Sequence, residues 1–554
     1  MIPSINHRDP KKVMTLARLG SFHQSKLSFL RSFIREFKDW EFKRDLFELD
    51  ENGYGTAVYS VNKDQRIYSL VCFANALNSE DRSDRVIATK WDAAFVLYDG
   101  VPSKEDIQRL KENVPKQEVG RLTYKELTLS RANKSVRIFE HTVDALSKGK
   151  QPDKNIVKDV GYLYRTTAVY GSGKFGLADR YRIKERSEIC GPFRLEMMLV
   201  YLVRQFTFDQ VNHIAKSRNP SKAVSLDDNI ARSLGIGNST GLGMAPFIVN
   251  HPTLLHNWIY SREEALRQIR SIEKVDVKDF NKFKDCFHKS KVNIKTWKTD
   301  SEYQIYKIEN LIKDLDIFEK KFLLELNFNE IYFWDKLYQW VEKELSDEGI
   351  EYIVSMLMEP YDDIINPLVE NMSSEEDLYF DIPGERLVSD LVNIIKSNYS
   401  NILDIDFNSK EEIANFWFIS KNKEEPRLAN RYEEEGSELE QPLAIARDIS
   451  QLYKKLVNSP ANETIAKFLM LNNDLRHVVR RCFIIEKFPY SEIQDNTIGS
   501  ELVPIDMLRL KLSFFGAQKF DPRSDKWLRI NMYQGAPLIH ELKSTTDTWI
   551  YNEL

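Results

Sequence analysis

The chain has 554 residues, of which 42% are hydrophobic and 29% charged, and its formal net charge is −5. That length exceeds one ordinary hydrophobic core and predicts about two to four domains. The slightly acidic charge argues against a nucleic-acid binder, which would carry a basic surplus. No apolar run approaches the roughly 20 residues of a membrane span, and the four cysteines stand far apart without a CxxC pair. We therefore expect a cytoplasmic protein with no nucleic-acid or membrane partner, no disulfide framework and no thiolate metal site.

The amino-terminal part of the chain predicts one helix followed by a small antiparallel sheet. Apolar residues recur at helical spacing over residues 18–42, which indicates an amphipathic helix. Residues 56–61 and 66–74 are rich in Val, Tyr, Ile and Phe, and the short polar segment between them is typical of a hairpin turn. Residues 85–98 supply a third strand or a third and a fourth strand, and residues 103–113 then predict a helix.

Helices dominate the next stretch of the chain. Residues 132–146 are predicted to be a helix, and residues 155–166 to be helical or mixed. The strongest helix is predicted over residues 193–216, where leucine, methionine, valine and phenylalanine form an unusually broad apolar face. We expect that helix to be buried. Residues 227–234 predict one more helix, with Gly235 as its C-cap.

The carboxyl-terminal half is predicted to be mostly helical. Its helices are expected at residues 303–324, 331–345, 349–358, 385–399, 444–457 and 463–486. Strand-like segments occur at residues 416–420, 508–515 and 527–533. Residues 274–298 are charged and poor in periodicity, so we place the join between the two halves there.

Two short segments repeat the same pattern. Residues 170–176 and 515–521 both read aromatic, glycine, small residue, any residue, lysine, phenylalanine. Two further pairs of similar segments precede them in the same order: residues 127–136 with 469–478, and residues 59–64 with 419–424. We interpret these pairs as an internal duplication. The predicted fold class is therefore α+β, helix-dominated, with a small and mostly antiparallel sheet in each of two duplicated halves, residues 1–275 and 276–554.

The repeated motif does not fit the pattern of a phosphate-binding P-loop. That loop needs an earlier glycine and a serine or threonine after the lysine, and these positions hold Ala168 and Phe175. Both copies keep a glycine that permits close approach of the backbone, such as Gly171, followed by a lysine, Lys174 or Lys519. We interpret the two lysines as anion-binding groups of one site where the halves meet.

Arginines near the repeated motif favour the anion-binding interpretation. Arg180 and Arg523 follow the two lysines within a few residues, and a guanidinium suits bidentate binding of a carboxylate or phosphate. The structural alternative is equally open. In that alternative the glycine makes a tight turn, and each lysine forms an ion pair with a neighbouring acid such as Asp179 or Asp525.

A second glycine-rich stretch lies at residues 235–243. It lacks the last glycine of the dinucleotide-binding GxGxxG fingerprint, whose position holds Thr240. Residues 237–241 match the GxSxG nucleophile elbow, but that elbow needs a strand before it, so a Ser239 nucleophile is a further alternative. Backbone N–H groups and the polar residues Asn238, Ser239 and Thr240 ahead of helix starts predict a loop that binds carboxylate or phosphate. An ordinary capped connection between helices is the other interpretation.

One histidine is placed for proton transfer. His251 precedes Pro252 at the start of a predicted helix, where the imidazole pKa would be lowered and the neutral ring would act as a base. A capping or buried structural histidine is the alternative. The sequence contains no HExxH, HxH or dense carboxylate–histidine cluster, so no metal site is predicted.

These motifs favour a cytoplasmic enzyme that acts on a small anionic substrate between the two halves. The residues expected to act in catalysis are His251, Lys174 and Lys519. The residues expected to bind the substrate are Gly171, Arg180, Asn238, Ser239, Thr240 and Arg523. The sequence names no reaction class and no cofactor, and it is compatible with a homo-oligomer. The alternative is a non-catalytic structural or interaction protein of pseudo-dimeric architecture, and a Schiff-base lysine is a further hypothesis.

Overall fold

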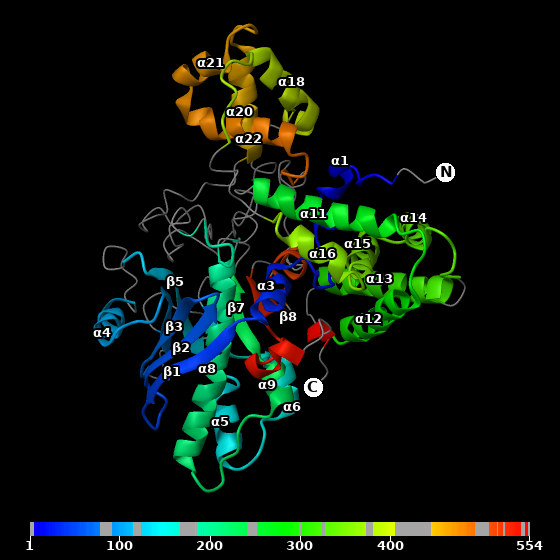
Figure 1. Ribbon diagram of the computed structural model, residues 1–554. Helices are drawn as coiled ribbons and strands as arrows, with labels where there is room; N and C mark the ends of the chain where they lie inside the picture. The colour runs from blue at the N-terminus through cyan, green and yellow to red at the C-terminus, as the bar shows by residue number, and fades with distance from the viewer. Residues whose placement is uncertain are drawn as a thin grey trace. The chain divides into compact units, whose positions relative to one another are not determined.

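The computed structural model describes residues 5–77, 91–114, 123–166, 183, 185–189, 191, 193–240, 252–297, 302–323, 327–372, 380–404, 445–493, 509–517, 519–524, 527–544, 549–551 and 554 (Figure 1). The chain divides into two compact units. Unit 1 comprises Met1–Leu27, Leu242–Glu434 and Glu440–Phe514, and unit 2 comprises Ser28–Gly241, Glu435–Leu439 and Phe515–Leu554. The boundary expected between residues 275 and 276 falls inside unit 1, between helices α11 (Pro252–Arg270) and α12 (Val277–Lys295).

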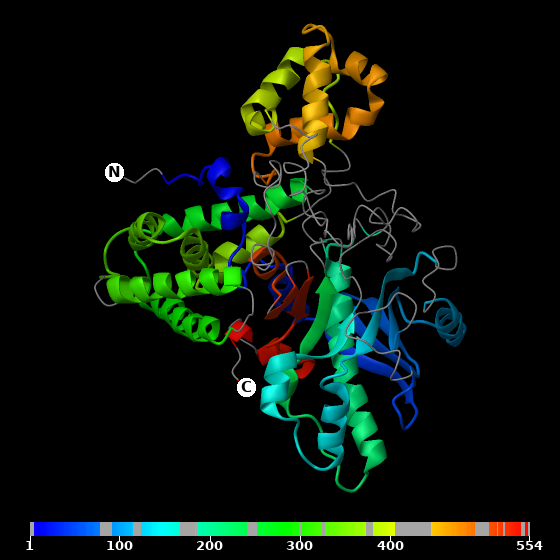
Figure 2. The same ribbon diagram turned by 180° about the vertical axis from the view of Figure 1, so that it is seen from behind.

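Unit 2 is built on one sheet. Among the described residues it is nine-stranded, in the order β1-β2-β3-β4-β5-β6-β7-β9-β8. The strands are β1 (Glu41–Leu49), β2 (Gly55–Lys63), β3 (Arg66–Ala74), β4 (Ala93–Asp99), β5 (Glu126–Lys134), β6 (Tyr162–Thr166), β7 (Gly235–Thr240), β8 (Lys519–Ser524) and β9 (Trp527–Met532). Neighbouring strands are antiparallel except β6 and β7, which are parallel. Figure 2 shows the red carboxyl-terminal strands beside β7.

The predicted pair of duplicated halves, each with its own small sheet, is wrong. Strands β8 and β9 from the carboxyl-terminal end pair with β7 instead of forming a second sheet. The segments matched by sequence also differ in structure: Leu127 and Leu129 lie in strand β5, whereas Leu469 and Leu471 lie in helix α21 (Ile465–Leu471). A short Leu-x-Leu pattern fits either element, because only a longer window separates the helical period from the strand period.

Helix α8 (Arg194–Arg218) covers one face of the sheet (Figure 1). Phe206 of this helix packs edge-on against Phe95 of β4 and lies beside Tyr164 of β6. The long buried helix predicted at residues 193–216 is confirmed. Apolar side chains occupy most of its circumference, so burial stabilises it on several sides.

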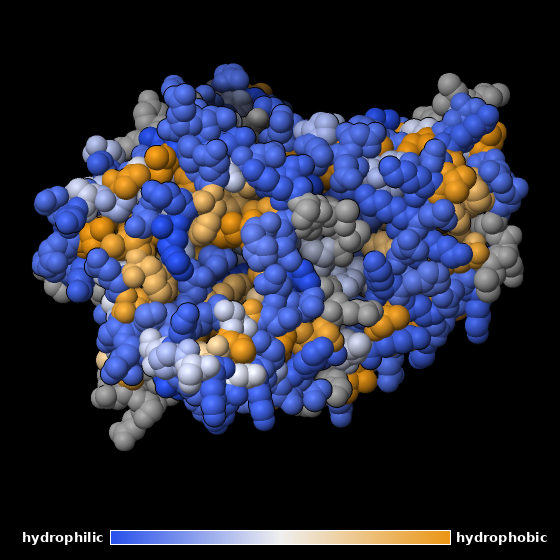
Figure 3. Space-filling model, turned by 60° about the horizontal axis from the view of Figure 1, so that its bottom comes forward, coloured by the Kyte–Doolittle hydropathy of each residue, from blue (hydrophilic) through white to orange (hydrophobic). Residues whose placement is uncertain are grey.

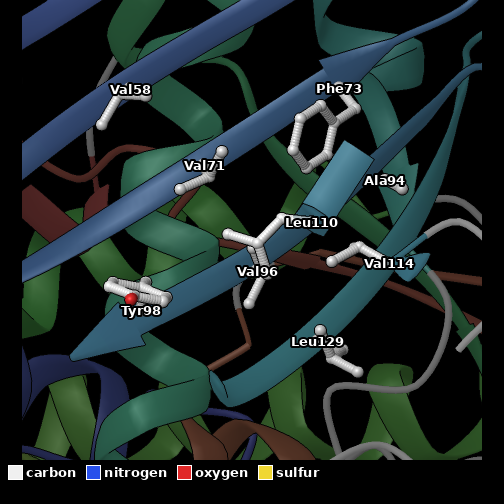
Figure 4. Close-up of a cluster of buried hydrophobic side chains, with 9 residues drawn as sticks. All are labelled: Val58, Val71, Phe73, Ala94, Val96, Tyr98, Leu110, Val114 and Leu129. Carbon is white, nitrogen blue, oxygen red and sulfur yellow. The ribbon is translucent and has the colours of Figure 1, made fainter. Parts of the chain in front are cut away.

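Helix α4 (Lys104–Asn113) covers the opposite face of the sheet at its β2–β5 end. A capping box between Ser103 and Asp106 starts the helix where the sequence predicts it. A buried cluster joins the helix to the strands (Figure 4): Val58, Val71, Phe73, Ala94, Val96, Tyr98, Leu110, Val114 and Leu129. This end of the sheet is a closed hydrophobic core. The other helices of unit 2 are α3 (Phe29–Phe37), α5 (Phe139–Ser147), α6 (Lys154–Val160) and α9 (Asp228–Arg232), with short 3-10 helices at Ile539–Ser544 and Trp549–Tyr551.

Several predictions of local structure differ from the fold. The hairpin is confirmed, with a two-residue turn at Asp64 and Gln65. The helix predicted at residues 132–146 is instead the end of β5 followed by α5. The strand predicted at residues 508–515 contains a π-helix (Lys511–Phe515), because an alternating apolar pattern of that length also fits one buried helical turn.

The regular elements among the described residues of unit 1 are all helices, and one isolated bridge joins Leu387 and Thr464. Its elements are α1 (Pro10–Val13), α2 (Leu16–Leu19), α11, α12, α13 (Glu302–Phe318), η4 (Glu319–Leu323), α14 (Phe333–Glu344), α15 (Asp347–Leu357), α16 (Asp362–Val369), α18 (Val388–Asn398), η5 (Ser400–Ile402), α20 (Ile445–Val457), α21, η7 (Asn473–Leu475) and α22 (Arg476–Lys487). The join expected at residues 274–298 is therefore mostly helix α12. No helix in the described ranges has the length and apolar character to cross a membrane. The face in Figure 3 is mostly hydrophilic, with small hydrophobic patches.

A network of buried charges ties the amino-terminal segment to α11 and α15. Arg8 donates to Glu263 at 2.7 Å and to Glu351 at 2.6 Å. Arg18 Nε donates to Glu351 at 3.1 Å, and a guanidinium nitrogen of Arg262 lies 3.6 Å from the same carboxylate. Burial alone would raise the pKa of Glu351, but these guanidiniums lower it to about 2. The carboxylate is therefore ionised inside the folded unit.

Candidate functional site

The parallel pair of strands marks the candidate site. Strand β6 ends at Thr166, helix α8 follows in the chain, and β7 returns to lie beside β6 with Asn238 opposite Thr166. In such β-α-β arrangements ligands bind outside the carboxyl ends of the parallel strands. The side chains next to the carboxyl ends of β6 and β7 are therefore the candidates for a ligand site.

Three buried polar side chains of β5 and β6 share one face of the sheet at this place. Asn133 pairs directly with Arg165, and Arg131 precedes Asn133 by two residues. Because alternate residues of a strand share a face, and directly opposed residues do so too, all three lie on one face. Helix α4 covers the same face at the β2–β5 end of the sheet, because Arg131 pairs with Ala94, which belongs to the buried cluster between α4 and the strands. Arg131 is 9% exposed, Asn133 2% and Arg165 3%.

Both arginines of this face are buried. The Arg131 guanidinium lies over the Trp91 ring, 3.8 Å from the ring centroid. Burial lowers the pKa of Arg131 to about 10, so it still carries its charge at neutral pH. Two guanidiniums on one face suit a ligand with a delocalised negative charge, because their N–H groups bind carboxylate or phosphate oxygens in pairs.

The Asn133 side chain adds an N–H donor to this face. Its Oδ1 accepts the backbone N–H of Asp92 at 3.1 Å. Within the described part of the chain, no acceptor lies within hydrogen-bond distance of its buried Nδ2. A buried donor left in that condition costs about 1–3 kcal/mol, and a bound water, ion or ligand that accepts its hydrogen bond removes that cost. An oxygen atom of a ligand between the two arginines would satisfy it.

The first half of the glycine-rich stretch is strand β7, so the loop predicted there is wrong for residues 235–240. A Cβ at Gly235 would lie 2.3 Å from the carbonyl oxygen of Met532, and a Cβ at Gly237 would lie 2.7 Å from the ring of Tyr162. Close packing against β9 and β6 therefore requires these two glycines. Gly237 is extended rather than left-handed, and the later glycines of the stretch lie outside the described residues.

The three polar residues of this stretch continue β7. Asn238 is buried and paired with Thr166, and its Nδ2 lies 3.4 Å from the Thr166 carbonyl oxygen. Its side chain therefore lies on the face opposite to Arg165. The backbones of Ser239 and Thr240 pair with β9, Ser239 opposite Arg529. Since Ser239 lies within a paired strand, it does not occupy the sharp turn of a nucleophile elbow.

The second glycine motif enters the same sheet. Gly516 has a φ of 84°, as a turn at this place requires. Lys519 starts β8 and pairs with Asn531, which in turn pairs with Gly237. Two strand spacings, about 10 Å, therefore separate the backbones of Lys519 and Gly237. Arg523 lies near the other end of β8. At that end Pro522 pairs with Leu528 of β9, and Leu528 pairs with Thr240 of β7.

Four predicted residues lie outside the described residues: Gly171, Lys174, Arg180 and His251. Along the chain the first three follow β6, and His251 follows β7. The residues that sequence reasoning missed are Arg131, Asn133 and Arg165. A signal existed in the alternation of Leu129, Arg131 and Asn133, but part of that segment is also compatible with the start of a helix.

Unit 2 also holds an open cavity of about 380 Å³ between β1 and the carboxyl-terminal half of α8. It is lined by Arg44, Phe47, Asp209, Asn212, His213, Lys216, Ala223, Val224 and Ser225. Its polar groups largely satisfy one another: Arg44 donates to Asp209 at 3.1 Å, and His213 bonds the Asp50 carbonyl oxygen at 2.8 Å. We therefore assign the site to the arginine pair rather than to this cavity.

No protein-family model, no curated protein and no solved structure matches this chain.

Proposed function

We propose that unit 2 binds a small anion, a carboxylate or a phosphate, at the carboxyl end of β6 and β7, and that this anion is the substrate of an enzyme. The observation that carries the proposal is the buried Asn133 Nδ2, a donor without an acceptor in the described residues. It lies beside two buried arginines on the same face of the sheet.

The proposed substrate class is the one predicted from the sequence. The proposed site lies within unit 2 and not between two duplicated halves. Arg131, Asn133 and Arg165 supply N–H donors, and low exposure strengthens their attraction for a charged ligand. We propose that Lys174 and Arg180, which follow β6 along the chain, add further positive charge. A proton-transfer role for His251, which follows β7, is proposed on the same ground.

The test is to titrate the full chain with inorganic phosphate and with succinate. Calorimetry measures the affinity, and the shift in melting temperature gives a second measure of binding. Arg131→Gln and Arg165→Gln are each expected to weaken binding about tenfold or more. A hydrogen bond to a charged group contributes about 1.5–3 kcal/mol, and 1.4 kcal/mol corresponds to a factor of ten. Arg66→Gln is the matched control, because Arg66 lies in β3 and forms an exposed pair with Glu188 at 3.0 Å.

The outcome that contradicts the proposal is equally defined. If neither anion raises the melting temperature of the natural chain, or if both arginine variants bind like the Arg66→Gln control, the arginine pair is structural. The non-catalytic interaction protein then becomes the better interpretation.

A further inference from the structure

Three side chains with metal-binding chemistry meet inside unit 1. His23 lies in the segment after α2, Cys286 lies in α12, and Glu359 follows the end of α15. The ligand atoms of these three residues all lie within 4.8 Å of one another. His23 and Glu359 are buried, whereas Cys286 is partly exposed.

The distances require only a small adjustment to admit an ion. His23 Nε2 and Glu359 Oε1 lie 2.7 Å apart. Tetrahedral coordination at about 2.0–2.3 Å separates neighbouring ligand atoms by about 3.3–3.7 Å. The two atoms therefore need to separate by roughly 0.6 Å, and a rotation of the Glu359 carboxylate supplies that movement.

The backbone of Glu359 is held by a second layer of contacts. Lys26 Nζ donates to the Glu359 carbonyl oxygen at 2.8 Å and lies 2.5 Å from the Asp362 carboxylate. Lys282 lies 3.2 Å from the same carboxylate, so Asp362 offsets part of the positive charge of the two lysines. Glu359 also stands just beyond the carboxyl end of α15, where the helix dipole favours a cation.

The ligand types select the class of metal. Magnesium and calcium take oxygen ligands, whereas zinc takes a thiolate, an imidazole and a carboxylate together. We propose that unit 1 binds Zn²⁺, or a similar first-row divalent ion such as Co²⁺, through His23, Cys286 and Glu359. The thiolate and the carboxylate balance the charge of the ion, and three protein ligands leave a fourth position for water or a small ligand.

The sequence predicted no metal site because the three ligands come from distant segments and no spacing motif marks them. A second group of potential ligands, Asp228, His540 and Glu541 in unit 2, is more exposed and contains no cysteine. That group provides an internal control for adventitious binding at the surface.

The test is Co²⁺ binding to the full chain after metal is removed with EDTA. A thiolate bound to Co²⁺ produces a charge-transfer band in the near ultraviolet, and we expect this band with one ion per chain. Added Zn²⁺ is expected to displace Co²⁺ and to raise the melting temperature. Cys286→Ser is expected to abolish the band and to weaken Zn²⁺ binding by about tenfold or more. His540→Gln is the control and is expected to change neither.

A second variant keeps the test decisive if Cys286→Ser does not fold. Glu359→Gln retains the thiolate, so the band is expected to persist while Zn²⁺ affinity falls by about tenfold or more. The site is overturned if the natural chain shows no charge-transfer band. It is equally overturned if the band persists in folded Cys286→Ser, or if Glu359→Gln leaves the Zn²⁺ affinity unchanged.

Discussion

Replacing Glu351 with glutamine is expected to lower the free energy of unfolding by about 3–5 kcal/mol, because it leaves buried guanidiniums without their counter-charge. Arg8 and Arg18 both donate to this carboxylate, and its side chain is fully buried. Denaturant unfolding followed by circular dichroism measures the loss. Glu330→Gln is the matched control in unit 1: its pair with Lys336 at 2.7 Å is exposed, so a change of about 0–1 kcal/mol is expected.

The same carboxylate predicts how stability depends on pH. The pKa of Glu351 is about 2 in the folded chain, below its ordinary value of 4.5. A group with a lowered pKa contributes its full stabilisation above the ordinary value and loses it as the pH falls towards the folded one. As the pH is lowered from about 4.5 to about 2, the denaturant concentration at the unfolding midpoint of the natural chain should therefore decrease. The decrease should be smaller in Glu351→Gln. Equal pH dependence in the two proteins would contradict a role for this network.

Gly235→Ala is expected to destabilise unit 2 by about 3 kcal/mol or more, since a new methyl group meets backbone that has no room to move. The added Cβ would lie 2.3 Å from the Met532 carbonyl oxygen and 2.7 Å from the Gln534 nitrogen. Relief requires β9 to separate from β7, which breaks the connection between the carboxyl-terminal strands and the sheet.

Gly191→Ala provides the comparison for this prediction. The atoms nearest to a Cβ at Gly191 belong to the Arg194 side chain, at 3.1 Å, and not to backbone, so a small shift of that side chain relieves the contact. We expect a change within about 1 kcal/mol. A melting temperature of Gly235→Ala equal to that of Gly191→Ala would show that β7 and β9 do not pair as closely as described.

Local periodicity predicts individual elements well but does not predict which strands pair. The β2–β3 hairpin and the buried helix α8 follow directly from their apolar patterns. The pairing of β9 with β7 joins segments far apart in the chain, and no local pattern encodes that contact. The duplication inferred from short similar segments failed for the same reason, because it assumed that similar local patterns form similar elements.

The anion site predicted from the sequence rests on lysines and glycines, several of which lie outside the described residues. The anion site that we propose rests on other residues: Arg131, Asn133 and Arg165. Because 29% of the residues are charged, an arginine in the sequence does not by itself indicate a site. Their burial and their common face emerge only from the register between β5 and β6. The glycines of β7 mislead for a related reason, since Gly235 and Gly237 serve strand packing.

The most direct test of the proposed anion site is a crystal structure of the full chain soaked with inorganic phosphate or succinate. We expect an anion at the carboxyl end of β6, with its oxygens about 2.7–3.2 Å from Asn133 Nδ2 and from the guanidinium nitrogens of Arg131 and Arg165. An Asn133 Nδ2 that instead donates to a protein oxygen, with no anion beside the two arginines at saturating ligand, would contradict the proposed site.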